Sequence, residues 1–282
     1  MNIPLLTWNV NGRTAKVLDA FIADGRLDSD LLTLQEVKHH HAAEFIQRLA
    51  DLGFQSIHTG DPTNAGKTYG NLIASKWPME RIALRLSDPP PFPSLIGHAR
   101  VAIASGEPVD VLTVHAPNGS NNGWAKIYTL EALRRVIETI SPGPLIVTGD
   151  FNEPQFFPGV LPIRSWGWTR EQTWEADRDK LWSRKGDQGS TDEHPLGRWD
   201  DAVVWFFDKD ESHGLRHAYW AKHDDGAMEA SYMTRSVSHP ERWFDHAFVS
   251  SHFKVIDCTY RHDVRRPEGE SDHSALSVRL AY

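Results

Sequence analysis

The chain has 282 residues, of which 40% are hydrophobic and 24% charged, a composition typical of a folded globular protein and not of a disordered chain. Its 38 acidic and 30 basic residues give a net charge of -8, which argues against broad, non-specific polyanion binding but permits a local basic face. One cysteine, no signal peptide and no apolar run of roughly 20 residues lead us to expect a cytoplasmic protein, monomeric by default, without a membrane partner.

The N-terminal part of the sequence alternates apolar strands with amphipathic helices. Residues 5–12 predict a strand that ends in two amides and a glycine, and residues 31–36 predict a second strand that ends in a polar pair. The helix after the first strand begins at Thr14 and ends at Gly25, and the helix after the second strand ends at Gly53. Strands that alternate with helices are typical of α/β proteins.

Four strands then follow one another without helices between them, which favours antiparallel pairing. They cover residues 71–75, 81–86, 99–104 and 109–115. Residues 125–140 predict the clearest helix of the chain, because its apolar residues recur at helical spacing. Two prolines end this helix, and residues 145–148 form an apolar β-branched run that predicts a buried strand.

The segment from about residue 155 to 241 has no regular pattern and is rich in tryptophan. We interpret it as long loops with short helices that form a lid or a wall facing the substrate. Regularity returns with three strands over residues 243–250, 253–260 and 275–280. No repeat or linker divides the chain, so residues 1–282 are expected to form a single domain with a Trp-rich insert.

Polar side chains repeatedly follow the most apolar strands. They are Asn9, Asn11, Glu36, His115, Asn118, Asp150, Asn152, Asp245, His246, Asp272 and His273. One interpretation is ordinary turn chemistry, since Asp and Asn favour turns. The other is a common site, because strand ends of one layered core lie together and clefts form beyond them. A carboxylate next to a buried strand is costly unless it is paired or binds a metal, which favours the common site.

The acidic members of this set suit a hard divalent cation. Glu36 and Asp272 offer carboxylate oxygens, and Asn9 can add an amide oxygen, which is the ligand set that Mg²⁺ or Mn²⁺ prefers. The sequence has neither a set of cysteines nor an HExxH motif, which argues against a zinc protease.

The remaining members suggest hydrolysis of a phosphate ester. Asp150 would orient and activate a water molecule, and Asn152 would fix the position of this water or of a phosphate oxygen. His273 could stabilise negative charge at the phosphorus centre, while Asp245 would hold one of its imidazole nitrogens. His115 is a second cationic or hydrogen-bonding candidate for the phosphate. Together these roles describe metal-assisted attack of water on a phosphodiester or phosphomonoester.

Several other residues have two interpretations. Asn118 is a further catalytic candidate beside His115. Lys38 is more simply explained as a solvated or ion-paired lysine, and His39–His41 as surface residues, because three neighbours at the start of a helix point in different directions. The tryptophans are packing anchors, with one or two available to stack on bases, a contact that contributes about 1–3 kcal/mol per base.

The strand-end motifs, taken in order, resemble those of the endonuclease/exonuclease/phosphatase superfamily. They are Thr-Trp-Asn-Val-Asn-Gly at 7–12, Leu-Gln-Glu-Val-Lys at 34–38, His-Ala-Pro-Asn at 115–118, Gly-Asp-Phe-Asn at 149–152 and Ser-Asp-His at 271–273. The resemblance implies a four-layer α/β sandwich of two packed mixed β-sheets flanked by helices. It also implies a divalent-metal phosphoesterase, with Glu36 as a metal ligand and with Asp150 and His273 at the reaction centre.

Within the superfamily, the motifs are most similar to the exonuclease III and AP endonuclease branch, although His115 replaces the tyrosine of that branch and is similar to pancreatic-type deoxyribonucleases. The leading hypothesis is therefore a Mg²⁺- or Mn²⁺-dependent phosphodiesterase that hydrolyses nucleic acid. The alternatives are a small-molecule phosphoesterase acting on nucleotides, phosphorylated sugars or lipid headgroups, and a catalytically inactive member that only binds.

Overall fold

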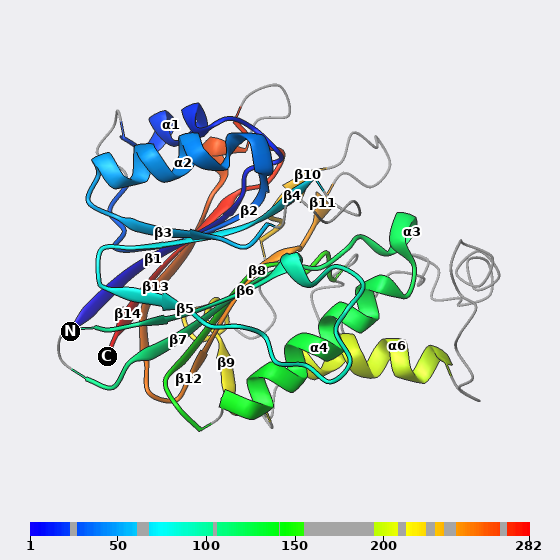
Figure 1. The fold of residues 1–282 in the computed structure, drawn as a ribbon. Helices are drawn as coiled ribbons and strands as arrows, with labels where there is room; N and C mark the ends of the chain where they lie inside the picture. Colours follow the sequence, from blue (N-terminus) through cyan, green and yellow to red (C-terminus); the bar gives the residue numbers. More distant parts are fainter. Residues whose placement is uncertain are drawn as a thin grey trace.

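The computed structural model describes residues 1–22, 27–60, 68–103, 106–140, 142–154, 195–207, 213–223, 229–233, 241–265 and 270–282. These residues form two mixed β-sheets that pack face to face, with helices on the outer face of each sheet (Figure 1). The expected fold class, a four-layer α/β sandwich, is thereby confirmed. Among the described helices, none has the length and apolarity needed to cross a membrane.

Each of the two large sheets has six described strands and contains one parallel pair. The first sheet has the spatial order β13 (Lys254–Arg261), β14 (Ala275–Ala281), β1 (Asn2–Asn9), β2 (Leu31–Lys38), β4 (Tyr69–Ser75) and β3 (Gln55–His58). The second has the order β5 (Met79–Arg81), β6 (Ile96–Val101), β7 (Val109–His115), β8 (Leu145–Asp150), β12 (Asp245–Ser250) and β9 (Leu215–His217). A small ribbon pairs β10 (Tyr232–Met233) with β11 (Glu241–Arg242).

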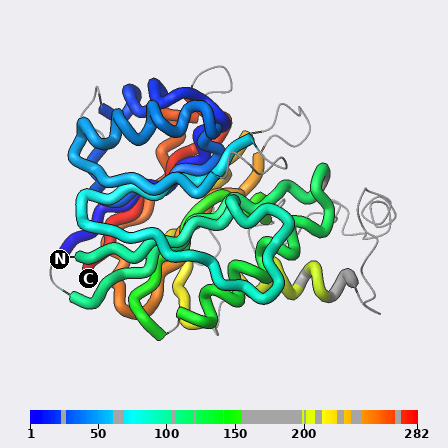
Figure 2. The backbone as a smooth tube through the Cα atoms, in the orientation of Figure 1, coloured from blue at the N-terminus to red at the C-terminus, as the bar shows by residue number. Residues whose placement is uncertain are grey.

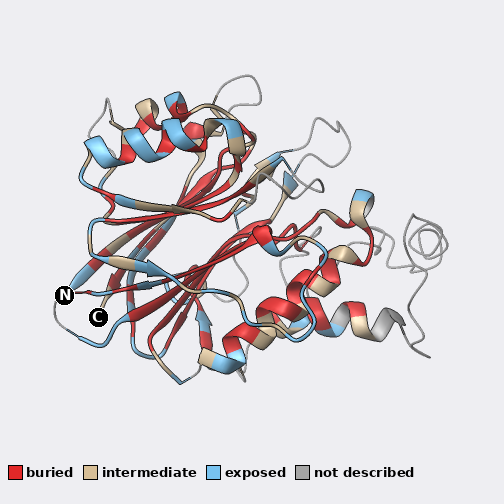
Figure 3. Cartoon of the chain, in the orientation of Figure 1, coloured by how far each residue is buried: buried red, intermediate tan, exposed pale blue. Residues whose placement is uncertain are grey.

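The helices divide between the two outer faces. The first sheet is covered by η1 (Ala15–Leu18), α1 (Asp19–Ile22) and α2 (His39–Asp51), and the second by α4 (Ala125–Ile140) and α6 (Pro195–Val204). Short helical turns complete the chain: η2 (Pro93–Leu95), α3 (Gly119–Asn122), η3 (Trp205–Phe207) and η4 (His262–Val264). The helices bury the side that faces a sheet and expose the other, as amphipathic sequences require (Figure 3).

The sequence predicted most of these elements. The helix over 125–140 and the strand over 109–115 are confirmed with the same bounds. The strand predicted over 81–86 is wrong: β5 ends at Arg81, and residues 82–86 are irregular, with Leu84 and Leu86 packed against the core beneath α4. Thr14 precedes the first helical turn as expected, but its side chain makes no capping hydrogen bond. Gly25 and most of the Trp-rich segment lie outside the described residues.

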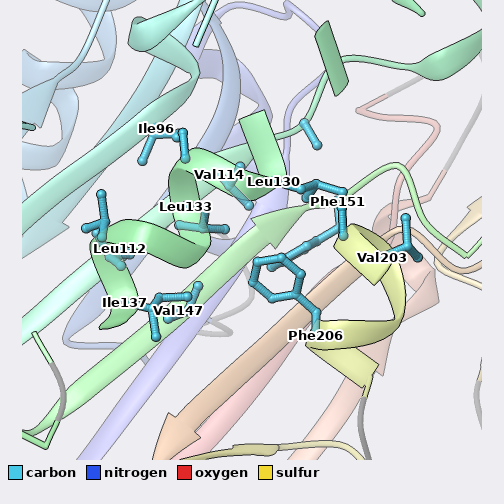
Figure 4. Close-up of a cluster of buried hydrophobic side chains, with 14 of the residues drawn as sticks. Ile96, Leu112, Val114, Leu130, Leu133, Ile137, Val147, Phe151, Val203 and Phe206 are labelled. Atoms are coloured by element: carbon cyan, nitrogen blue, oxygen red, sulfur yellow. The ribbon is translucent and has the colours of Figure 1, made fainter. Parts of the chain in front are cut away.

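Two apolar cores hold the second sheet. The outer core joins α4 to the sheet through Leu130, Leu133 and Ile137, which pack against strand residues and against Phe206 (Figure 4). The inner core lies between the two sheets and is built mainly from aliphatic side chains of both. The strands therefore carry apolar side chains on both faces, which explains why the sequence shows continuous apolar runs instead of a strict alternation.

A polar layer replaces the inner core near one end of the sheets. The Thr33 and Thr148 hydroxyls, from the first and second sheet, lie 2.7 Å apart. The Gln35 amide nitrogen donates to Thr7 on its own sheet at 3.1 Å and to Thr113 on the other sheet at 3.0 Å. All five side chains are buried. Hydrogen bonds between two sheets fix their relative position more specifically than apolar contacts do.

The chain termini and the polar layer lie at opposite ends of the sheets. The N- and C-terminal residues lie side by side (Figure 2), and the Met1 ammonium donates to the Tyr282 carbonyl at 2.7 Å. From there β1 runs to Asn9, where its pairing with the parallel strand β2 ends, while β7 and β8 end together at His115 and Asp150. The polar strand ends of both sheets therefore meet at one rim.

Gly149 allows the closest backbone approach at this rim. It lies in β8 with φ +138, and a Cβ atom at this position would lie 2.0 Å from the Val114 carbonyl oxygen of β7. Any other residue would have to separate the two parallel strands immediately before His115 and Asp150.

We therefore expect Gly149→Ala to destabilise the fold by about 3 kcal/mol or more, because a backbone clash adds to the cost of a strained φ. Gly53→Ala is the matched control: Gly53 also has a positive φ, +84, but a Cβ atom there would contact nothing within 4 Å. It should cost only about 1–2 kcal/mol. Equal losses for the two variants in urea unfolding would contradict the assignment.

Candidate active site

Strand pairing brings the candidate residues together from five strands. In the second sheet, His115 and Asp150 are direct partners on parallel strands, and Asp245 opens β12 opposite Asp150. In the first sheet, Asn9 pairs with the residue before Glu36. The geometry thus brings together groups that lie more than two hundred residues apart in the sequence.

A bulge and three positive φ angles direct the polar side chains toward this rim. The pairing of β2 with β4 shifts register between Leu34 and Val37, so that two residues of β2, including Glu36, lie opposite one residue of β4. Glu36 has φ +58, and the only other non-glycine residues with positive φ in the described chain are Asn11 and Asn152. Such conformations are costly outside glycine, and they cluster at functional sites.

Asn9 connects the two sheets at the centre of the site. Its side-chain nitrogen donates to Asp150 Oδ2 at 2.8 Å and to Glu36 Oε1 at 3.1 Å, while its side-chain oxygen accepts from the Asn11 backbone N–H at 2.9 Å. The amide nitrogen, and not the amide oxygen, therefore faces the carboxylates. In this arrangement Asn9 orients two acids, and its role as a metal ligand stays a prediction.

Asp150 is the most constrained carboxylate of the site. It is 1% exposed, and its Oδ1 accepts from the Asn152 backbone N–H at 2.8 Å. Burial and the neighbouring Asp245 raise the pKa of Asp150 to about 6, against the opposing effect of His273 and His115. At neutral pH the carboxylate is therefore mostly ionised but more basic than an ordinary aspartate.

His273 forms an ion pair with Asp245. Its Nδ1 lies 2.8 Å from Asp245 Oδ2, and its Nε2 lies 3.8 Å from Asp150 Oδ2. Burial lowers the pKa of His273, but the charges of Asp245 and Asp150 outweigh burial and raise this pKa to about 10. The imidazole is thus a cation at neutral pH, with Nε2 directed toward Asp150.

Buried hydrogen bonds hold both His273 and its partner Asp245 in place. The Trp8 indole N–H donates to the His273 carbonyl at 3.0 Å, and the Ser271 hydroxyl accepts from the His273 N–H while donating to the Asn9 carbonyl at 2.6 Å. On the other side, the Ser231 hydroxyl accepts from the Asp245 N–H at 3.0 Å. The histidine and its acidic partner are therefore fixed by β1 and by the segment before β10.

His115 completes a second group of potential ligands. Its Nε2 lies 3.5 Å from Glu36 Oε1 and 3.7 Å from Asp150 Oδ2. Potential ligand atoms of these three residues lie within 4.8 Å of one another, and the same holds for Asp150, Asp245 and His273. His115 Nδ1 and Asp245 Oδ1 are buried and have no hydrogen-bond partner among the described residues. A carboxylate-rich set with buried, unsatisfied atoms fits a bound cation.

The other predicted residues lie at the edge of this group or have structural contacts. Asp272 lies on the open side, with its Oδ1 4.0 Å from His273 Nε2, and burial, Glu36 and Asp245 raise its pKa. The Asn152 amide donates to the Ala116 carbonyl at 2.8 Å. Asn118 caps α3 by accepting from the Asn121 N–H, and its catalytic role stays a prediction.

Aromatic residues that the sequence did not single out border the site. The ring of Tyr69 lies 5.3 Å from that of His115, and the ring of Tyr232 lies 4.7 Å from that of His273. Tyr232 also stacks on Phe244, at 5.2 Å and an interplanar angle of 19°. Both tyrosines are the first residues of strands, where an aromatic side chain is usually part of the core. Of these aromatic residues, only Phe244 could have been found from the sequence, because it stands next to Asp245.

The tryptophans fall into two groups. Trp166, Trp168, Trp174 and Trp182 lie outside the described residues. Trp199 is buried in the core beneath α4, and Trp205 and Trp220 pack against it, which is the anchoring role expected for them. The expected lid lies largely outside the described residues.

The sequence from residue 6 to 273 matches the model of the Endonuclease/Exonuclease/phosphatase family. The chain belongs to this family, whose members hydrolyse phosphoester bonds. No curated protein matches the sequence significantly.

Solved structures share the fold at low sequence identity. The 3'-5' exonuclease NExo from Neisseria meningitidis is 21% identical, with a TM-score of 0.67 over 99% of this chain and 100% of that one. An AP endonuclease from Archaeoglobus fulgidus is 17% identical, with a TM-score of 0.67 over 99% of both chains. The 2',3'-cyclic phosphatase ANGEL2 is 17% identical, with a TM-score of 0.62 over 99% of this chain and 95% of that one.

The raised pKa of Asp150 predicts a pH-dependent stability difference. Because the folded state binds the Asp150 proton more tightly than the unfolded state, the stability of the wild type should fall as pH rises from about 4 to about 6. Asp150→Asn lacks this contribution. Its stability relative to wild type should therefore rise by about 1–3 kcal/mol between pH 4.5 and 7.5 in urea unfolding with EDTA. Asp257→Asn, at an exposed position of β13, is the control variant, and a difference for Asp150→Asn that does not change with pH would refute the assignment.

The ion pair with Asp245 predicts the charge state of His273. Asp245→Asn should lower the pKa of His273 from about 10, because burial then acts against a weaker counter-charge. In the wild type, the stabilisation from this pair is complete below about pH 6.5 and is lost as pH rises through about 10. NMR titration of the imidazole measures both effects. An unchanged His273 pKa in Asp245→Asn, with Asp257→Asn as the control, would show that Asp245 is not its counter-ion.

Proposed function

We propose that the protein is a divalent-metal-dependent phosphodiesterase that hydrolyses nucleic acid. The observation that carries this proposal is the convergence of Glu36, Asp150 and His273, from three separate strand ends, on one rim between the sheets. The family membership supports phosphoester hydrolysis in general, and the more specific substrate and metal are our inference.

Asp150 is the residue best suited to activate water. A pKa of about 6 leaves the carboxylate ionised at neutral pH and yet basic enough to accept a proton as the attacking water loses it. Hydrogen bonds from Asn9 and from the Asn152 backbone hold both of its oxygens, so the carboxylate does not need to reorient during the reaction.

His273 and His115 are suited to the phosphate. A protonated His273, held by Asp245, places positive charge where negative charge develops on the phosphoryl oxygens. His115, on the other side of Asp150, provides a second ring nitrogen that can hydrogen-bond the phosphate. Asn152 remains our candidate for fixing the water or a phosphate oxygen.

We assign the metal to the open side of the site. Glu36 and Asp272 would hold Mg²⁺ or Mn²⁺, which prefer carboxylate oxygens, and Asn9 would orient Glu36 or add its own oxygen. The cation would neutralise charge on the phosphate and increase the acidity of bound water. The buried atoms without partners at His115 and Asp245 support a site built for a charged ligand.

Aromatic side chains support a nucleic-acid substrate. The stacked pair of Tyr232 and Phe244 beside His273, and Tyr69 beside His115, place flat apolar surfaces on both flanks of the carboxylates. Such surfaces can stack on bases or sugars. A related structure of NExo is bound to a product DNA hairpin.

We also propose that the protein is cytoplasmic, since its one cysteine is buried and free, and that it acts as a monomer.

The second candidate is a small-molecule phosphoesterase. The net charge of -8 disfavours a long polyanionic substrate, and ANGEL2, a structural neighbour, was solved with adenosine-2',3'-vanadate. A nucleotide would use the same Asp150 and His273 but would need only one aromatic contact.

Purified protein should cleave DNA or RNA with Mg²⁺ or Mn²⁺ and lose this activity in EDTA. Asp150→Asn and His273→Ala should each reduce kcat about 100-fold or more, because each removes a group that acts in the transition state. Asp257→Asn should retain full activity.

A panel of single-stranded and double-stranded substrates, nucleotides and 2',3'-cyclic nucleotides separates the two candidates. Binding of nucleic acid should weaken steeply with salt, whereas binding of a nucleotide should change little. Hydrolysis of nucleotides alone would replace the leading proposal by the second, and no metal-dependent hydrolysis of any of these substrates would overturn both.

A further inference from the structure

A lysine of α4 is buried directly behind the loop that carries Asp150. Lys126 is 0% exposed, and its ammonium donates to the Asn152 carbonyl at 2.6 Å and to Glu153 Oε1 at 2.5 Å. Glu153 is itself 1% exposed. Two opposite charges are therefore enclosed in the protein at the point where the chain leaves β8.

A buried ion pair is an expensive way to stabilise a fold. Removing two charges from water costs several kcal/mol per ion, and well-packed apolar residues of similar volume often replace such a pair without loss of stability. Burial lowers the pKa of Lys126 in spite of the opposing charges of Glu153 and Asp150. The pair thus needs an explanation other than stability alone.

The hydrogen bonds of Lys126 and Asn152 connect this ion pair to Asp150. Asn152 has φ +52, in the left-handed region that is costly for most residues other than glycine, and its backbone N–H holds Asp150 Oδ1 at 2.8 Å. The Lys126 ammonium holds the carbonyl of the same residue, so it fixes the peptide plane that follows Asn152. The Asn152 N–H belongs to the preceding peptide plane, and only the φ and ψ angles of Asn152 separate the two planes. If the later plane were released, Asn152 could leave its left-handed conformation, and the direction of its N–H toward the carboxylate would no longer be fixed.

A second buried contact anchors the same loop. Nε2 of His246 lies 2.8 Å from the Glu153 carbonyl, and Nδ1 of His246 lies 3.0 Å from Nε2 of His217. Because a carbonyl only accepts, His246 donates from Nε2 and accepts from His217. Both faces of the turn after Asp150 are therefore held by buried polar groups, one charged and one neutral.

We propose that Lys126 and Glu153 are positioning residues for Asp150. They hold Asn152 in its left-handed conformation so that the Asp150 carboxylate keeps the direction in which it activates water. This inference rests on the proposed function for its effect on catalysis, whereas its effect on the loop is independent of the substrate.

The test replaces both charges at once with Lys126→Met and Glu153→Met, so that neither is left buried alone. We expect kcat to fall roughly 10- to 100-fold with KM unchanged, because a displaced base affects the transition state more than substrate binding. The thermal midpoint should stay within a few degrees of wild type. The pair Lys126→Gln and Glu153→Gln, which keeps a donor for the Asn152 carbonyl, should recover most of kcat.

The matched control removes another ion pair of the same helix. Glu131 of α4 binds Arg198 of α6 at 2.6 Å and 2.7 Å, away from the loop. Glu131→Met with Arg198→Met should leave kcat at the wild-type value. Amide hydrogen exchange at Asn152, measured by NMR, gives a second result that does not depend on activity: exchange should be faster in the Lys126 and Glu153 methionine variant and unchanged in the control.

Each outcome decides the proposal. Wild-type kcat and wild-type exchange at Asn152 in the methionine variant would overturn it, and so would a methionine variant that fails to fold, because the pair would then serve stability. If the wild type hydrolyses no phosphoester, the proposed function fails while exchange at Asn152 still tests the positioning role.

Discussion

The site depends on two polar contacts that cross from one sheet to the other. Asp150 of the second sheet is held by Asn9 of the first, and His273 beside the first sheet is held by Asp245 of the second. Each of the two side chains that we propose to act on the phosphate or the water thus has an orienting partner on the opposite layer. A shift of one sheet over the other would break both contacts together, so the packing of the sandwich and the geometry of the site are a single constraint.

Burial changes the chemistry of the two central groups in complementary ways. It raises the pKa of Asp150, which remains an anion at neutral pH but becomes a stronger base. It would make His273 neutral, but the carboxylates around it keep the imidazole charged. The same enclosed environment therefore provides a base and a cation side by side, and the difference lies in which neighbours each group has.

The sequence predicted the fold and much of the site because both follow from strand ends. Apolar runs followed by polar pairs marked the ends of β1, β2, β7 and β8, and the structure brings their side chains together. The sequence could not predict the bulge at Glu36, since a register shift depends on the neighbouring strand. The sequence also did not single out Lys126, because a lysine is normally solvated, although position 126 lies four and seven residues before Leu130 and Leu133 on the apolar face of the helix. Nor could it predict the irregular path of residues 82–86, whose leucines pack against the core.

The hydroxyl and amide groups between the sheets have a mechanical consequence. Apolar contacts between aliphatic side chains are non-directional, whereas a hydrogen bond weakens once its angle departs from linear. Gln35, Thr33 and Thr148 therefore resist shear in the part of the interface beneath the rim, while the aliphatic remainder offers less resistance. The sandwich is stiffest against sliding where sub-ångström alignment matters, and more compliant toward the end where its termini lie.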